Sequence, residues 1–311
     1  MVGASEVSEK LHIPVLAEEV IKWLACRAGG RYVDCTVGQG GLASLILEGT
    51  EPDGFLIGID QDAEAIAASR DHLARFGSRV VLLQGNFSDL KRHLLSVGVS
   101  EVDGVVFDLG MSSAQLDRPE RGFSLAAEGP LDMRMDRSRG PTAADLLDRL
   151  SETDLADVIY RYGEERYSRR IARAVVRARM LRPFRTTSEL VSVIRGAVPA
   201  SYRHGRITCA TRTFQALRIA VNRELEVLEQ SLRGAVEVLA PAGRLCVISF
   251  HSLEDRITKQ TLRALSQGEC PALSVLTRKP EVPSDEECRK NPRARSAKLR
   301  VAERLAERRP P

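Results

Sequence analysis

The sequence lacks the features of a membrane, secreted or zinc-binding protein. No apolar run reaches the roughly 18–20 residues that a membrane-spanning helix needs. The first ten residues show no basic start followed by an apolar stretch, so we expect no signal peptide. The six cysteines form no Cys-x-x-Cys pair and the five histidines no metal-type spacing, which argues against a disulfide framework or a structural metal. We therefore expect a cytoplasmic globular protein with free thiols and no metal.

Lysine is missing from one long stretch of the chain. Residues 160–206 contain 12 arginines and three acids but no lysine, which gives this segment a charge of +9. The whole chain carries only +4, so the remainder is weakly acidic. A basic patch on a weakly acidic body predicts a polyanionic partner.

Strands and helices alternate in the first third of the chain. Short apolar runs predict strands at 31–35, 55–60, 80–84 and 102–108. Helical periodicity is found at 15–25, from 42 to 48 and at 62–76. Repeating strand–helix units of this length favour a parallel sheet that is covered on both faces.

The alternation stops near residue 110 and resumes near residue 210. Residues 109–141 read as loop and 143–197 as helical. After them we expect one long helix at 211–237, a strand at 244–250, a helix at 252–265 and two late strands at 272–277 and 297–302. The simplest organisation is a sheet domain made of residues 1–112 and 207–311, with an inserted helical domain at 113–206.

A glycine-rich turn follows the first strand. Gly38, Gly40 and Gly41 let the backbone approach a ligand closely. Ligands of open α/β sheets bind at the carboxyl ends of the strands. Asp60 ends the second strand, 22 residues after Gly38, and is placed to accept hydrogen bonds from the ribose hydroxyls of an adenosine.

The glycines alone fit a dinucleotide as well as S-adenosylmethionine. Two acids favour the latter. Asp34 precedes the glycine turn, and a carboxylate suits a cationic amino-acid tail better than a pyrophosphate. Asp108 ends the fourth strand at the same edge of the predicted sheet.

Longer motifs carry a family resemblance. They are Phe107-Asp-Leu-Gly-Met-Ser-Ser-Ala-Gln-Leu-Asp117, Arg121-Gly-Phe-Ser, Gly129-Pro-Leu-Asp-Met-Arg-Met-Asp136, Tyr162-Gly-Glu-Glu-Arg166, Thr211-Arg-Thr-Phe-Gln-Ala-Leu-Arg-Ile219 and Ser249-Phe-His-Ser-Leu-Glu-Asp-Arg256. This series, in this order, closely resembles the bacterial 16S ribosomal RNA cytosine-N4 methyltransferases of the RsmH (MraW) family. The resemblance runs from about residue 12 to 304 and implies a Rossmann-like class I methyltransferase sheet with an inserted all-helical domain.

The resemblance also implies a cofactor site for S-adenosylmethionine, which leaves as S-adenosylhomocysteine. The residues that it assigns to the cofactor are Gly40, Gly41, Leu42, Asp60, Phe87, Asp108 and Gln115. Asp60 would hold the ribose, and an aromatic ring at Phe87 can stack on the adenine. The family often has histidine where this chain has Leu42; a backbone contact there survives the change, whereas a side-chain contact does not.

The implied substrate is one cytosine in the decoding centre of 16S rRNA within the small ribosomal subunit. The Asp/Ser-Pro-Pro-aromatic motif of many amino-group methyltransferases is absent, so the choice of N4 depends on the resemblance. Asp108 is the candidate catalytic residue, as the acceptor of an amine proton; the alternative is that it only holds the cofactor. His251 could reach the same site, although a lone histidine is more often a structural hydrogen-bonding residue.

Four arginines form the candidate RNA-binding surface. On a helix through 165–182, Arg166, Arg170, Arg173 and Arg177 recur at steps of four, three and four and make one basic stripe. Arginine forks suit phosphate. The alternative is a solvated helix face that acids elsewhere neutralise.

Three other functions stay open at this stage. They are a nicotinamide-dependent oxidoreductase on the same fold, a non-catalytic RNA-binding module, and an amino methyltransferase that acts on another RNA or on DNA. The sequence does not distinguish a monomer from a homodimer.

Overall fold

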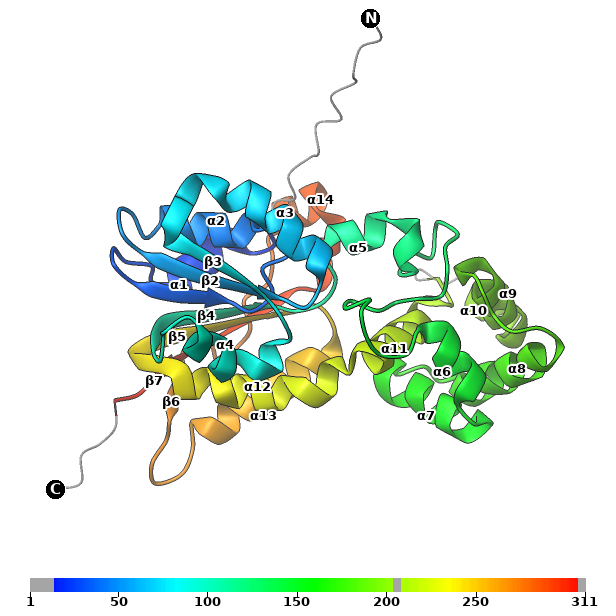
Figure 1. The fold of residues 1–311 in the computed structure, drawn as a ribbon. Coiled ribbons are helices and arrows are strands. Elements are labelled where there is room, and N and C mark those ends of the chain that lie inside the picture. The colour runs from blue at the N-terminus through cyan, green and yellow to red at the C-terminus, as the bar shows by residue number, and fades with distance from the viewer. Residues whose placement is uncertain (1–13, 204–207, 307–311) are drawn as a thin grey trace, which may run out of the picture. The chain divides into compact units, whose positions relative to one another are not determined.

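The structure is a computed structural model, and it describes residues 14–203 and 208–306 (Figure 1). Backbone contacts divide the chain into two compact units. The first, the sheet unit, comprises residues 1–60, 64–110 and 232–311, and the second, the helical unit, comprises 61–63 and 111–231. The helical unit thus extends beyond the segment 113–206 that the sequence analysis singles out, and that segmentation stays a prediction.

The described part of the sheet unit contains one seven-stranded sheet with the order β3-β2-β1-β4-β5-β7-β6. The strands are β1 Arg31–Asp34, β2 Phe55–Asp60, β3 Val80–Gln84, β4 Val102–Asp108, β5 Leu239–Ser249, β6 Leu273–Val275 and β7 Lys298–Arg304. The five strands from β3 to β5 are parallel, β7 is antiparallel to β5, and β6 is antiparallel to β7. The order reverses between β1 and β4, and such a switch point is where ligands of open α/β sheets bind.

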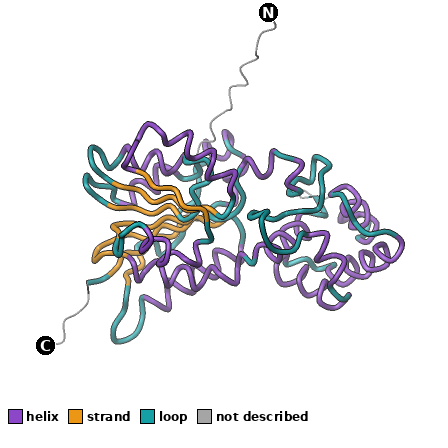
Figure 2. The backbone as a smooth tube through the Cα atoms, in the orientation of Figure 1, coloured by secondary structure: helices purple, strands orange, loops and turns teal. Residues whose placement is uncertain are grey.

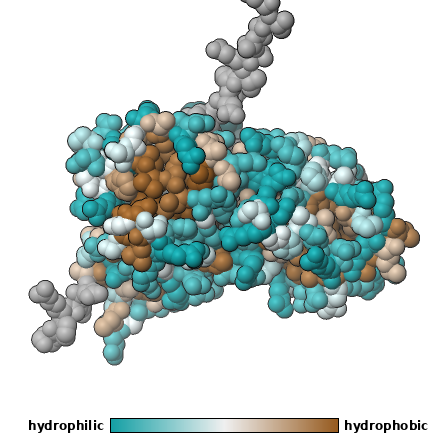
Figure 3. All heavy atoms as spheres, viewed as in Figure 1, coloured by the Kyte–Doolittle hydropathy of each residue, from teal (hydrophilic) through white to brown (hydrophobic). Residues whose placement is uncertain are grey.

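Helices cover both faces of this sheet. They are α1 Ala17–Leu24, α2 Gly41–Glu48, α3 Ala63–Leu73, α4 Leu90–Ser96, α12 Glu224–Val238, α13 Ser252–Leu265 and α14 Asp285–Lys290, of which α12 runs across the boundary of the two units. Figure 1 shows α2 and α3 on one face and α4, α12 and α13 on the other. β4 is consequently buried from both sides at Val105, Val106 and Phe107, as its continuous apolar sequence predicts. Figure 3 shows hydrophobic residues gathered at the surface over β2 and β3, where the edge strand β3 is only half-buried.

The helical unit consists of helices and loops (Figure 2). The helices are α5 Ser113–Asp117, α6 Ala143–Arg149, α7 Glu152–Gly163, α8 Ser168–Leu181, α9 Thr187–Ala197, α10 Ala200–Arg203 and α11 Thr211–Asn222. Its core includes Leu147, Ile159, Ile171, Ile194 and Leu217, all fully buried. The Rossmann-like sheet and the helices between β4 and β5 confirm the predicted fold class.

The prediction of one long helix at 211–237 was wrong. The chain forms two helices, α11 and α12, which meet at Arg223 with φ 53° in the left-handed region. Asn222 lies next to this turn; its Oδ1 accepts a hydrogen bond from Met135 N and its Nδ2 donates to Met133 O. The apolar periodicity continues on both sides of residue 223, so the sequence pattern alone does not reveal the turn.

No helix in the described part of the chain is long and apolar enough to cross a bilayer.

Candidate functional site

Three acids lie at the carboxyl edge of the sheet. Asp34 ends β1, Asp60 ends β2 and Asp108 ends β4. β1 lies between the other two strands, with Asp34 in register with Gly58 of β2 and Val106 of β4. The strand order therefore brings these carboxyl groups to the switch point, as the sequence predicts.

The glycine turn after β1 is braced by one of these acids. The N–H of Gly38 donates to Asp60 Oδ2 at 3.0 Å, and the N–H of Gly40 donates to Val37 O at 2.8 Å. Gly40 has φ 86°, and a Cβ there would come within 3.0 Å of Leu73. Both conditions require glycine at position 40. The result is a fixed turn with no side chain between its backbone and a ligand.

The turn leads directly into α2, whose first three residues are Gly41, Leu42 and Ala43. The N–H groups of a helix's first turn have no intrahelical acceptor and are available to an anion or a polar ligand. The Leu42 side chain is buried in the core of the sheet unit. Any contact of Leu42 with a cofactor would therefore be made by its backbone, and that contact stays a prediction.

A threonine links two of the acids. Thr36 Oγ1 accepts a hydrogen bond from Asp108 N at 2.7 Å, and Asp34 Oδ1 accepts one from Thr36 N at 3.0 Å. Asp34 is buried, whereas Asp108 is partly exposed as a residue but has a buried Oδ1. That Oδ1 has no hydrogen-bond partner among the described residues. A buried oxygen of this kind needs a partner, which a bound ligand can supply.

Burial and neighbouring acids raise the pKa of two of these carboxyl groups. Burial raises the pKa of Asp108 to about 8, and the charges of Asp34 and Glu254 add to the effect. Burial likewise raises the pKa of Asp34 to about 7, with a further contribution from Asp60. Both carboxyl groups therefore hold a proton for much of the time at neutral pH in the free protein. A bound cation favours their ionised forms.

Phe87 follows β3, at the same edge of the sheet. It begins a short 3-10 turn, whose cap is the Asn86 side chain accepting from Ser88 N at 2.9 Å. Its ring stands edge-on to Phe107, with centroids 5.5 Å apart and an interplanar angle of 81°. The buried Phe107 thus fixes the ring while Phe87 remains half-exposed. This geometry suits stacking on an adenine, and that role stays a prediction.

Gln115 is placed differently from the other predicted cofactor residues, because it belongs to the helical unit. Its Nε2 donates to Asp62 Oδ2 at 2.8 Å, and its Oε1 accepts from Ser112 N at 3.1 Å. The same Asp62 oxygen lies 2.8 Å from Nη1 of Arg121, whose side chain is 1% exposed. Both ends of the Gln115 amide thus have a partner within this unit, and its role in cofactor binding stays a prediction.

Asp62 and Arg121 form a buried ion pair that was not predicted from the sequence. Nη2 of Arg121 also donates to the carbonyl oxygens of Arg134 and Met135 at 3.1 and 3.2 Å. The pair therefore joins the segment after β2 to two parts of the long loop after β4. The only signal in the sequence was the motif that begins at Arg121, because Asp62 lies 59 residues before it.

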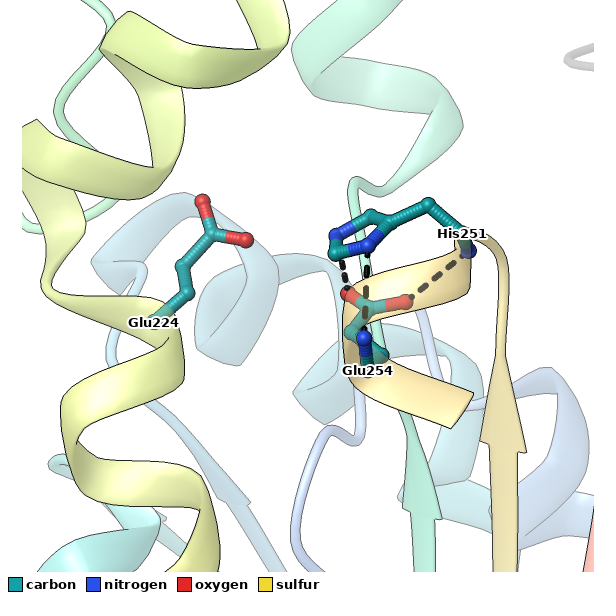
Figure 4. Close-up of side chains that lie close together, drawn as sticks. All are labelled: Glu224, His251 and Glu254. Atoms are coloured by element: carbon teal, nitrogen blue, oxygen red, sulfur yellow. Dashed lines mark hydrogen bonds and ion pairs between the residues drawn. The ribbon is translucent and has the colours of Figure 1, made fainter. Parts of the chain in front are cut away.

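His251 is a helix cap in this structure (Figure 4). Its Nδ1 accepts from Glu254 N at 3.4 Å, and its Nε2 lies 3.1 Å from Glu254 Oε1. Glu254 Oε2 in turn accepts from Phe250 N at 2.8 Å. The backbone hydrogen bonds of this pair fix the turn between β5 and α13. The buried His251 Nε2 forms no hydrogen bond with a described residue, and a part of His251 in catalysis stays a prediction.

The four predicted RNA-binding arginines are exposed, but they are not equivalent. α8 begins at Ser168, so Arg166 lies in the turn before the helix, and the predicted helix start at 165 was wrong. Arg173 forms an ion pair with Glu152 at 3.3 Å. Arg170 and Arg177 have no ion pair with any residue that the structure describes.

Comparison with known proteins identifies the family. The model of the MraW methylase family matches residues 9–305. A Geobacter protein named ribosomal RNA small subunit methyltransferase H is 50% identical over 307 residues, which cover 94% of this chain and 98% of the relative. A protein of that name from Geotalea daltonii is 51% identical with the same coverage, and one from Geotalea uraniireducens is 50% identical over 96% of this chain and all of its own.

This chain belongs to the MraW methylase family. It is a methyltransferase that uses S-adenosylmethionine, and its sheet is that of a class I methyltransferase. The residues at the carboxyl edge fit the cofactor. The sulfonium is a cation, and buried carboxyl groups at Asp34 and Asp108 suit it, while the unpaired Asp108 Oδ1 supplies an acceptor. The predicted family, enzyme class and cofactor are confirmed, and the dehydrogenase alternative is excluded.

The raised pKa values predict that cofactor affinity depends on pH. S-adenosylmethionine is positively charged at sulfur and S-adenosylhomocysteine is not, so the ratio of their affinities isolates the sulfonium. Ionised carboxylates attract the cation, and ionisation increases from pH 6 to pH 8 because the pKa values are about 7 and 8. We expect the ratio to shift toward S-adenosylmethionine by about tenfold over that range. Calorimetry with both ligands measures it; Asp108→Asn should weaken the trend, and a flat ratio in the native protein would contradict the prediction.

The Asp62–Arg121 pair predicts a large loss of stability on truncation. Arg121→Met leaves Asp62 buried without its cation, which we expect to lower the free energy of unfolding by about 3–5 kcal/mol. The matched control is Arg139→Met, because Arg139 pairs with Asp136 at the surface, with its side chain 65% exposed. Its cost should be at most about 1 kcal/mol. Urea unfolding followed by circular dichroism gives both values, and equal values would show that the buried pair is not important for stability.

Proposed function

We propose that this methyltransferase transfers the methyl group of S-adenosylmethionine to the exocyclic N4 amine of one cytosine in the decoding centre of 16S rRNA, within the small ribosomal subunit. The observation that carries the proposal is the near-full-length identity of about 50% to proteins named ribosomal RNA small subunit methyltransferase H. Such an enzyme works where ribosomes are assembled, in the cytoplasm. The oligomeric state, monomer or homodimer, stays open.

The reaction needs a positioned nucleophile. When bound, the cofactor supplies an electrophilic methyl group for an in-line displacement. The enzyme's main contribution is to hold the amine in line with that group, which can lower the barrier by roughly 7–11 kcal/mol. The target base must first be unstacked so that its amine can reach the cofactor.

Asp108 is the residue that we assign to the amine. The lone pair of a cytosine amine is delocalised into the ring, so the amine is a weak nucleophile. A carboxylate that accepts one N–H bond raises the electron density on nitrogen. The amine loses one proton as the N–C bond forms, and Asp108, with a pKa of about 8, can hold that proton before it passes to water.

Asp108→Asn separates a catalytic role from cofactor binding. The amide keeps the size of the side chain but cannot accept a proton. If Asp108 assists the amine, the single-turnover rate should decrease by about 10²-fold or more, while cofactor affinity decreases far less. Rapid-quench transfer and calorimetry measure the two quantities. Equal losses in both would mean that Asp108 only holds the cofactor.

The substrate can be tested directly. Purified protein and tritiated S-adenosylmethionine are incubated with small ribosomal subunits that lack the modification, with large subunits and duplex DNA as controls. We expect label only in 16S rRNA and, after nuclease digestion and mass spectrometry, only in N4-methylcytidine. Label in another nucleoside, in large-subunit RNA or in DNA would contradict the proposed substrate.

The arginines of the helical unit support RNA as the substrate. Replacing Arg166, Arg170, Arg173 and Arg177 together by glutamine removes four charges from an exposed surface. We expect weaker binding and a slope of log affinity against log salt that is smaller by about 3. Fluorescence anisotropy with 16S rRNA over a salt series measures this slope, and an unchanged slope would show that these arginines do not contact phosphate.

A further inference from the structure

One exposed arginine of the helical unit is flanked by two tyrosine rings. Cζ of Arg166 is 4.8 Å from the ring centroid of Tyr167 and 4.9 Å from that of Tyr202. The two rings meet edge to face, with centroids 4.9 Å apart and an interplanar angle of 69°. Each of the three groups therefore contacts the other two. Attraction between the guanidinium and both rings restricts the Arg166 side chain. A surface arginine normally has more freedom.

A buried acid holds this arrangement in place. Glu165 is fully buried, and its Oε1 accepts from Tyr167 N at 2.8 Å. Its Oε2 accepts from the Tyr202 hydroxyl at 2.7 Å, a bond between residues 37 positions apart. Burial raises the pKa of Tyr202 to about 12, and the bond to Glu165 adds to the effect, so the hydroxyl remains a donor at neutral pH. Glu165 thus joins the turn before α8 to α10.

The hydrogen-bond donors of Arg166 are not used within the described part of the chain. No described residue accepts a hydrogen bond from its guanidinium or forms an ion pair with it. A guanidinium over a ring makes contact through its face, which leaves its in-plane N–H groups for an acceptor. Arg169 and Arg170, in the first turn of α8, are exposed and likewise have no ion pair with a described residue. The local surface is positive, and forked donors suit phosphate.

We propose that Arg166 is a preorganised contact for a phosphodiester group of the RNA substrate, and that Tyr202 and Glu165 are positioning residues that hold it. This inference rests on the proposed RNA substrate. A flexible arginine loses side-chain freedom when it binds, whereas Arg166 is already restricted in the free protein. The rings also explain why the contact needs arginine, because lysine keeps the charge but has neither the planar face nor the fork.

The first test uses two substitutions that conserve charge. Arg166→Lys removes the planar guanidinium from the two rings, together with its fork. The control is Arg195→Lys, because Arg195 is an exposed arginine of α9 outside the four-arginine surface and the structure gives it no ring contact. Binding is measured by fluorescence anisotropy with a short labelled single-stranded RNA and with 16S rRNA. We expect Arg166→Lys to weaken binding by about tenfold and Arg195→Lys by less than about twofold. Equal effects would overturn the proposal.

The second test asks whether Tyr202 acts through Arg166. Tyr202→Phe keeps the ring and removes the hydroxyl that Glu165 holds. We expect it to weaken RNA binding by about threefold in the native background but to have no effect in the Arg166→Lys background, because contacting groups are coupled. A purely structural effect of Tyr202 would be the same in both backgrounds and would overturn its positioning role. Glu165→Gln should behave like Tyr202→Phe.

Controls separate this inference from the proposed function. Circular dichroism melting shows whether each variant remains folded, and cofactor affinity should be unchanged. If the native protein neither binds RNA nor methylates small subunits, the proposed function fails. If it does both and the Arg166→Lys variant binds RNA as tightly as the Arg195→Lys variant, the RNA function stands and the role of Arg166 is rejected.

Discussion

Thr36 links Asp34 and Asp108, the two acids on which the proposed cofactor site depends. Its hydroxyl accepts from the backbone of Asp108, and its N–H donates to Asp34, so the ends of β1 and β4 are tied together at the switch point. This brings two carboxyl groups close in a place with little water. Their pKa values rise as a consequence, to about 7 and 8. Ionising these carboxyl groups costs free energy when the site is empty. A cationic ligand offsets this cost and a neutral ligand does not, so the site favours the cation.

Another acid at this edge of the sheet holds the glycine turn in place. Asp60 accepts from Gly38 N, which fixes the turn; its backbone and the first turn of α2 are the groups that we propose contact the cofactor. A dinucleotide site uses a similar turn to bind a pyrophosphate. What separates the two chemistries here is the pair of carboxyl groups at Asp34 and Asp108, because their ionised forms attract a sulfonium and repel a phosphate.

Buried ion pairs and caps perform the supporting roles around the functional surfaces. Asp62 and Arg121 anchor the loop after β4, and His251 with Glu254 fixes the turn after β5. Glu165 does the same for the turn before α8. In each case an ionisable side chain forms hydrogen bonds that hold the backbone in place. Hydrogen-bond partners therefore show which titratable residues hold the backbone, whether or not these residues also take part in catalysis.

The sequence by itself determined the elements whose signal is local. The strands at 55–60, 80–84 and 102–108 were predicted with the bounds that the structure has, because short apolar runs end there at glycine or polar residues. Asp60 and Asp108 could be placed at one edge because parallel strands share a direction. The substrate was different, since only the resemblance of long motifs indicated it.

Tertiary structure decided the features that depend on partners far apart in the chain. Asn222, beside the break at Arg223, binds the backbone of residues 133 and 135, and the partner of Gln115 is Asp62, 53 positions away. The rings beside Arg166 are held by a bond between Glu165 and Tyr202, which meet only in the folded chain. Periodicity records which face of a helix is apolar; it carries no information on which distant polar group a side chain will meet.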